Sequence, residues 1–122
     1  MNTLTKAEEQ VMQILWGLTE ANVKNLVEGF TDPKPAYTTV ATVLKVLEKK
    51  EFVSHEKNSN TLLYKAIVSK TEYTKFQLSN LLVNYFNGSF PKMATFFAKE
   101  NDISIKELEE IINEAKEELG NN

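Results

Sequence analysis

The chain has 122 residues, of which 42% are hydrophobic and 25% are charged, and its formal net charge is −3. This length suits one domain or two very small ones, and it allows a core that folds without disulfides or structural metals. Cysteine is absent and histidine occurs once. This composition excludes disulfides, thiolate metal sites and cysteine nucleophiles, and it argues against histidine-rich metal sites.

The sequence contains no apolar run near the roughly 18–20 residues that a membrane span requires. Its first residues, MNTLTKAEEQ, lack the charged and then apolar pattern of a signal segment. We therefore expect a cytoplasmic protein with no membrane insertion, and we expect no cofactor and no metal.

The acidic residues concentrate in the second part of the chain. Residues 1–70 contain nine lysines and eight acids, a net charge of +1, whereas residues 71–122 contain five lysines and nine acids, a net charge of −4. All 14 basic residues are lysines. The overall charge is therefore a poor guide to nucleic-acid binding, and the local placement of lysines matters more.

The first part of the chain predicts three helices. Thr5-Lys6-Ala7-Glu8 has the spacing of a capping box and opens a helix over about residues 5–17, with Gly17 as its terminator. A short helix follows, with Asn22 as its N-cap and Gly29 as its stop. Apolar side chains at helical spacing predict a third helix over about residues 37–50. Its inner face would carry Val40, Val43, Leu44 and Leu47.

A hairpin and further helices come next. Two extended runs, residues 52–57 and 61–68, flank the polar turn Asn58-Ser59-Asn60 and predict a β-hairpin. Helical segments then begin near Ser69, Pro91 and Ser104. Three helices followed by a hairpin are typical of a winged helix-turn-helix. We therefore predict a mainly α fold with a small β-hairpin: a winged-helix DNA-binding domain at residues 1–70 and a helical dimerisation domain at residues 71–122.

The third helix has an outer face of small and basic side chains. These are Thr38, Ala41, Thr42, Lys45 and Lys49. Short hydroxyls can reach base edges in the major groove, lysines can follow the phosphates, and a helix N-terminus offers free N–H groups to a phosphate. A plain solvated helix explains the same pattern, so the helix alone does not decide. The order of elements favours DNA.

The predicted DNA contacts follow from this placement. The residues expected in the major groove are Tyr37, Thr38, Thr39, Thr42 and Lys45. Asn22 and Lys24, at the start of the second helix, and Lys57, at the wing, would hold phosphates. The turn of the hairpin is also compatible with a plain polar loop. We interpret His55 as a surface residue of the hairpin rather than a metal ligand, because no second histidine exists.

The C-terminal helices carry two apolar surfaces. The last helix repeats apolar residues in steps of three and four, as in a heptad seam. About 50 residues cannot easily bury both surfaces, so we expect a homodimer, while packing on the first domain is the alternative. The residues predicted at the dimer interface are Phe76, Leu81, Leu82, Tyr85, Phe86, Leu108, Ile111, Ile112, Ala115 and Leu119.

Catalytic motifs are absent from the sequence. Glu8-Glu9 and Glu109-Glu110 are adjacent pairs that fit solvated helix surfaces better than an acid–base pair. There is no Ser-His-Asp set, no phosphate-binding glycine loop and no metal motif. We therefore expect no enzymatic activity and no catalytic residues.

Two stretches resemble the penicillinase-repressor family, which includes BlaI and MecI and has the copper-responsive CopY repressors as relatives. Residues 4–16, LTKAEEQVMQILW, match the family opening L-T-x-A-E-x-x-V-M-x-x-L-W, and Tyr37-Thr38-Thr39-Val40 with Leu47-Glu48-Lys49-Lys50 resembles its recognition helix. Tyr64-Lys65-Ala66 continues the match along the hairpin. The resemblance implies a transcriptional repressor that binds a palindromic double-stranded DNA operator as a homodimer.

The resemblance also implies a membrane-bound sensor metalloprotease that cuts the repressor in its dimerisation domain and supplies its own zinc. Penicillinase repressors are cut at the Asn-Phe bond of an N-F-A-K run. The corresponding run here is Phe96-Phe97-Ala98-Lys99, so we expect cleavage between Phe96 and Phe97, although the asparagine is missing. The cysteine pairs of the copper-responsive relatives are also missing, which excludes copper sensing of that kind.

One further departure keeps a second function open. The family helix often carries arginine in its C-terminal half, where this chain has Lys45-Val46, so bidentate arginine contacts are unavailable. With a nearly neutral first domain, the alternative is a winged-helix module that binds another protein and no DNA.

Overall fold

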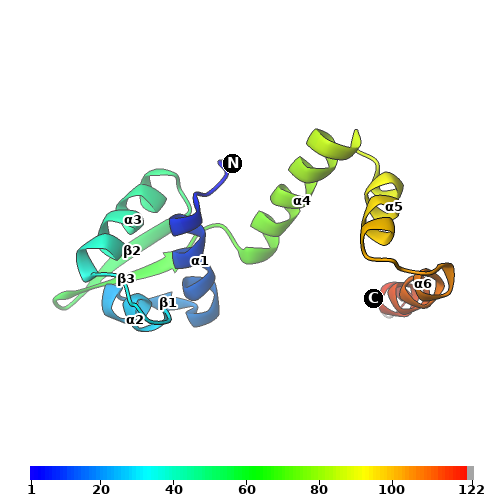
Figure 1. Ribbon diagram of the computed structural model, residues 1–122. Coiled ribbons are helices and arrows are strands. Elements are labelled where there is room, and N and C mark those ends of the chain that lie inside the picture. Colours follow the sequence, from blue (N-terminus) through cyan, green and yellow to red (C-terminus); the bar gives the residue numbers. More distant parts are fainter. Residues whose placement is uncertain (121–122) are drawn as a thin grey trace. The chain divides into compact units, whose positions relative to one another are not determined.

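The computed structural model describes residues 1–120, which fall into two compact units that divide between Gln77 and Leu78. Figure 1 shows the elements in chain order. The helices are α1 (Lys6–Leu18), α2 (Val23–Glu28), α3 (Tyr37–Lys49), α4 (Lys70–Phe86), α5 (Phe90–Glu100) and α6 (Ile105–Gly120). The strands are β1 (Glu20–Ala21), β2 (Val53–Asn58) and β3 (Thr61–Ala66). The predicted class, mainly α with a small β-hairpin, is confirmed.

The sheet of the first unit is antiparallel, with the strand order β1-β3-β2. β2 and β3 form the predicted hairpin, which we call the wing, with a register that runs from Val53 opposite Ala66 to Asn58 opposite Thr61. Ser59 turns the chain with a positive φ of 58°. The two-residue strand β1, which the sequence pattern did not predict, pairs with β3 and joins the wing to the start of α2.

The first unit has one continuous apolar core. Its buried members come from α1, α2, α3 and the sheet, and they include the predicted inner residues Val40, Leu44 and Leu47 of α3. Val43 is half-buried against the same core. Ala41, which we expected on the outer face, is also half-buried against it, because its small side chain lies at the edge of the apolar stripe.

The first half of α4 belongs to this core. The buried ring of Tyr73 lies 6.1 Å from Trp16 and 5.7 Å from Phe52, and its hydroxyl oxygen accepts a hydrogen bond of 2.9 Å from the Leu4 N–H. Phe76 packs against the same cluster. The first unit therefore extends seven residues beyond the boundary drawn from the sequence at residue 70.

The helix starts follow the predicted capping chemistry. Thr5 and Glu8 form the expected capping box of α1, and Asn22 caps α2 together with Asn25. Gly17 does not terminate α1. The helix continues through it and ends at Thr19, where φ is 74°, because a single glycine costs a helix only about 1 kcal/mol.

The second unit, from Leu78 on, buries little of its apolar surface. Among its described residues Ala98 is the buried hydrophobic side chain, and a hollow of about 440 Å³ is lined by apolar residues of α4, α5 and α6 and by Ile103. Asn87 and Gly88, both at positive φ, turn the chain between α4 and α5. No helix in the described part of the chain is long and apolar enough to cross a membrane.

Candidate nucleic-acid interface

The exposed face of α3 carries the small side chains that the sequence predicted there. Thr38, Thr39, Thr42 and Lys45 are exposed, and Tyr37, at the first position of the helix, is 60% exposed. The Thr42 hydroxyl donates a hydrogen bond of 2.9 Å to the Thr38 carbonyl oxygen. Thr42 therefore offers its oxygen lone pairs and its methyl group to a ligand, which suits a base amino group or a thymine methyl.

The N-terminus of α3 differs from those of the other helices. Ala36 occupies its N-cap and gives no side-chain hydrogen bond. In each of the five other helices described, an N–H group of the first turn donates to the side-chain oxygen of a residue before the helix: Thr5, Asn22, Ser69, Ser89 or Ser104. The N–H groups of Tyr37 and Thr38 thus keep their hydrogen-bonding capacity, whereas the Thr39 N–H donates to the Ala36 carbonyl oxygen at 3.1 Å. The two groups stand at the positive end of the helix dipole, which suits a phosphate.

A hollow of about 400 Å³ joins the start of α2, the start of α3 and the wing tip. Its lining consists of Asn22, Val23, Lys24, Tyr37, Asn60, Thr61 and Leu62. The Asn22 side-chain oxygen accepts a bond of 2.8 Å from the Asn25 N–H, so the Asn22 amide NH₂ is the part that can serve a ligand. Three elements far apart in the sequence therefore present polar side chains to one space.

This hollow unites some of the predicted residues and adds new ones. Asn22, Lys24 and Tyr37 line it, and Lys57 lies opposite the lining residue Leu62 in the wing register. Thr42 and Lys45 lie further along α3. Asn60 was predicted only as part of the polar turn at the wing tip, and Thr61 was not predicted. A short turn fixes the register of a hairpin. The Asn/Ser turn of the sequence could therefore have shown that Asn60 and Thr61 lie beside Asn58 and Lys57 at the wing tip.

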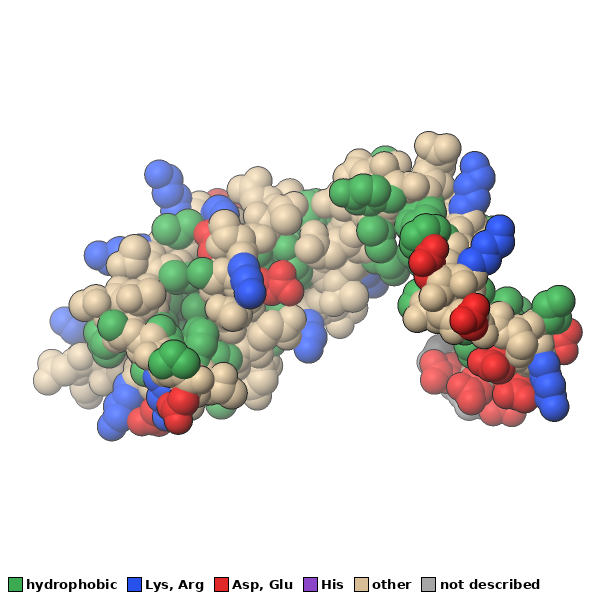
Figure 2. Space-filling view, in the orientation of Figure 1, with side chains coloured by type: hydrophobic (Ala, Val, Ile, Leu, Met, Phe, Trp, Pro, Cys, Tyr) green, Lys and Arg blue, Asp and Glu red, His purple; other side chains and the backbone are tan. Residues whose placement is uncertain are grey.

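The lysines of this region are not neutralised. In the described residues Lys24, Lys45, Lys49 and Lys57 form no ion pair, whereas Lys50 pairs with Glu8 at 2.7 Å and Lys65 with Glu20 at 3.6 Å. Figure 2 shows lysine side chains standing out from the first unit. These four lysines are therefore not held in ion pairs by acids of the first unit.

A polar cluster lies between α3 and the wing. Glu48, in the last turn of α3, contacts the Nδ1 atom of His55 on β2, and the His55 ring lies 5.3 Å from the ring of Tyr64 on β3. Burial and the nearby negative charge of Glu48 raise the pKa of Tyr64. Tyr64 therefore stays neutral at physiological pH. His55 is exposed on the hairpin, as predicted, and it also connects the hairpin with α3.

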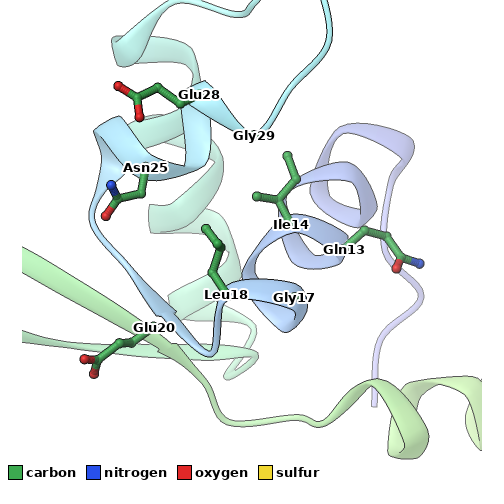
Figure 3. Close-up of a pocket in the computed structure, with 8 residues that line it drawn as sticks. All are labelled: Gln13, Ile14, Gly17, Leu18, Glu20, Asn25, Glu28 and Gly29. Carbon is green, nitrogen blue, oxygen red and sulfur yellow. The ribbon is translucent and has the colours of Figure 1, made fainter.

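A second hollow, of about 600 Å³, lies between α1 and α2. Figure 3 shows Ile14 and Leu18 pointing into it, whereas the carboxylates of Glu20 and Glu28 point outward on different sides. Ligand sites require polar groups that converge, so this hollow is a gap over apolar packing. The described residues also contain no group of His, Asp or Glu side chains that could hold a metal ion.

Comparison with known proteins places the chain. Residues 4–117 match the penicillinase repressor family. This chain belongs to the penicillinase repressor family. It is 26% identical over 111 residues to the methicillin resistance regulatory protein MecI of Staphylococcus aureus, with 90% of each chain covered. It is 24% identical over 109 residues to the penicillinase repressor of Bacillus licheniformis, covering 88% of this chain and 85% of the relative.

Solved structures agree on the fold. The DNA-binding domain of the repressor BlaI superimposes with a TM-score of 0.51 at 22% identity, covering 58% of this chain and 88% of the domain. The monomeric form of Bacillus licheniformis BlaI, in complex with the blaP half-operator, gives 0.50 at 22% identity, covering 59% and 89%. The winged-helix prediction is confirmed. The family is one of repressors, which confirms that the chain is not an enzyme.

Proposed function

We propose that this chain is a DNA-binding transcriptional repressor that presents the start of α3, the start of α2 and the wing to double-stranded DNA. The observation that carries the proposal is the uncapped α3 N-terminus beside exposed hydroxyls and unpaired lysines, within a repressor family. The BlaI relative bound to the blaP half-operator supports the same class of partner.

Each group has a role that suits its geometry. Thr38, Thr42 and Lys45 lie on the exposed face of α3 and would enter the major groove, where their short side chains allow close approach. Tyr37 and Thr39 stand at the start of the helix, beside the free N–H groups that would bind a phosphate. Lys24, Lys57 and the Asn22 amide would hold the flanking backbone.

The second unit would join two copies into a homodimer that addresses a palindromic operator. Its apolar side chains are exposed on α4, α5 and α6, and a second copy could cover them. Phe76 lies outside this surface, because it packs on the first unit. The remaining predicted contacts belong to the second unit: Leu81, Leu82, Tyr85, Phe86, Leu108, Ile111, Ile112, Ala115 and Leu119.

Cleavage between Phe96 and Phe97 by a membrane sensor metalloprotease would release the operator. Both side chains are more than half exposed, although they lie within α5, so a protease would first have to unwind the helix locally. The cut would separate α6 from α4. Because two half-sites held by one dimer gain affinity through effective concentration, a weakened dimer loses the operator.

The test is a titration of the full chain on a labelled duplex from upstream of its own gene, over a series of salt concentrations. Binding should weaken linearly in log K against log salt, and Lys45→Ala should reduce the slope by about 1. Lys65→Ala is the matched control, because Lys65 is paired with Glu20 and lies outside the interface. A chain that retains no duplex at low salt would instead be a protein-binding winged helix.

A further inference from the structure

The outer part of the wing has few contacts with the rest of the unit. β2 is buried only at Val53 and exposed along the rest of its length. A two-stranded hairpin is at best marginally stable by itself, so its direction depends on whatever fixes it to the core. The contact between Glu48 and His55 provides such a fixation, since it joins the exposed strand to the last turn of α3.

His55 is held from two sides. Glu48 reaches it from α3, and the ring of Tyr64, which is 6% exposed and part of the core, lies against it from β3. The titratable groups in contact with it are thus Glu48 from α3 and Tyr64 from β3. Glu48 is the acid of this set.

His55 and Lys57 lie on the same face of β2, so a contact that holds His55 also positions Lys57. Side chains two residues apart share a face, so Val53, His55 and Lys57 lie on one side of β2. Val53 is buried in the core at one end, and Lys57 stands opposite Leu62 of the hollow at the other. His55 is therefore the last attachment to α3 before the lysine.

We propose that His55 is a positioning residue for DNA binding: its contact with Glu48 holds the wing at the angle to α3 that lets Lys57 reach a phosphate while α3 lies in the major groove. The inference rests on the proposed function, because it assigns the wing its phosphate contact.

The experiment measures duplex binding by fluorescence anisotropy over a salt series at one pH, with the full chain and the duplex used above. Lys57→Ala should reduce the salt slope by about 1, and His55→Gln should reduce it equally, because one lost phosphate contact changes the slope by about that amount. The double variant should show no further loss.

Two further variants separate positioning from folding. Glu48→Ala removes the same contact from the helix side and should reduce the slope as His55→Gln does, with β2 unaltered. Glu56→Ala is the matched control, because it removes a carboxylate from the opposite face of β2 and should leave the slope as in the wild type. Circular dichroism melts confirm that each variant is folded.

The outcomes distinguish this inference from the proposed function. A wild type that binds the duplex, with a His55→Gln variant of unchanged slope or with additive losses in the double variant, overturns the positioning role and leaves the repressor in place. A wild type that binds no duplex overturns the proposed function, and the positioning role is overturned with it.

Discussion

The two units of the chain bury their apolar side chains to very different extents. The first unit has 14 buried residues in one cluster, whereas Ala98 is the buried hydrophobic side chain among the described residues of the second. Val83, Tyr85 and Leu119 are 61%, 76% and 72% exposed. The contrast teaches that the first unit has a core of its own, whereas the second leaves apolar side chains exposed, as the proposed homodimer requires.

The last helix shows the same division on one element. α6 carries its acids on one side and an apolar seam on the other, and none of its side chains is buried. Figure 2 shows the acidic side chains gathered over α6. A helix that is polar on one face and apolar on the other must bury the apolar face to be stable, so the seam is where a partner helix should lie.

The largest expected effect tests the difference in burial between the two units, by truncation of one leucine in each unit. Leu44→Ala, at a fully buried site, should lower the free energy of unfolding by about 2–5 kcal/mol, because it leaves a cavity. Leu119→Ala, at a site 72% exposed, should change it by less than about 0.5 kcal/mol at concentrations where the chain is monomeric. Urea unfolding followed by the fluorescence of Trp16 measures both, and equal losses would contradict the contrast.

A charge placed in the seam should break the assembly and spare the fold. Ile112→Asp should weaken self-association by about 2 kcal/mol, because a carboxylate would be buried among apolar groups. Asn113→Asp adds the same charge on the polar side of α6 and is the matched control. Sedimentation at micromolar concentration measures the change. A wild type that sediments only as a 13.9 kDa species would show that the seam has another role.

Two glycines sharpen the account of the first unit. A Cβ atom at Gly29 would lie 2.5 Å from Ile14 Cγ2, so Gly29→Ala should destabilise the packing of α2 on α1 by about 1–3 kcal/mol. At Gly17, inside α1, nothing lies within 4 Å, and Gly17→Ala should stabilise the helix by about 0.5–1 kcal/mol. Thermal melts at one protein concentration should show shifts of opposite sign, and shifts of equal sign would contradict this packing.

The smallest expected effect concerns the capping carboxylate of α1. Burial opposes the charge of Glu8, but bonds from Lys50 and from the Thr5 backbone outweigh it and lower the pKa of Glu8 below its ordinary value of 4.5. Its contribution to stability is therefore present above that value and is lost as the pH falls through the lowered pKa. Glu8→Gln should cost about 1 kcal/mol at pH 6 and less at pH 3.

The control for Glu8 is its neighbour in the sequence. Glu9 forms no ion pair in the described part of the chain, so Glu9→Gln should change the free energy of unfolding equally little at both pH values. Urea unfolding at pH 6 and pH 3 compares the two variants with the wild type. A Glu8→Gln variant with the same deficit at both pH values would contradict the role of the carboxylate charge.

The parts of the fold that the sequence predicted are those set by interactions between residues close together in the chain. The caps Thr5 and Asn22 and the period of α3 are signals within a few residues, and all three are confirmed. β1 has two residues and no pattern of its own, and it exists because β3 lies beside it. Tyr73 joins the first unit through a bond to Leu4, 69 residues away, which no local pattern indicates.

The candidate site divides in the same way. The exposed threonines of α3 followed from helical periodicity. The missing side-chain cap at Ala36 became significant only by comparison with the other described helices, each of which has one. The contact of Glu48 with His55 depends on the angle between a helix and a hairpin, which tertiary packing sets. The sequence thus predicted which side chains α3 exposes. It did not predict which side chains of different elements come together.

The most direct test of the central claim is a hydroxyl-radical footprint of the full chain on the DNA upstream of its own gene. If the first unit grips DNA and the second joins two copies, the footprint should show two protected blocks whose centres lie about 10 base pairs, or a multiple of that, apart. Ile112→Asp should weaken both blocks together. A chain that protects no site at low salt, where phosphate contacts are strongest, would contradict the account.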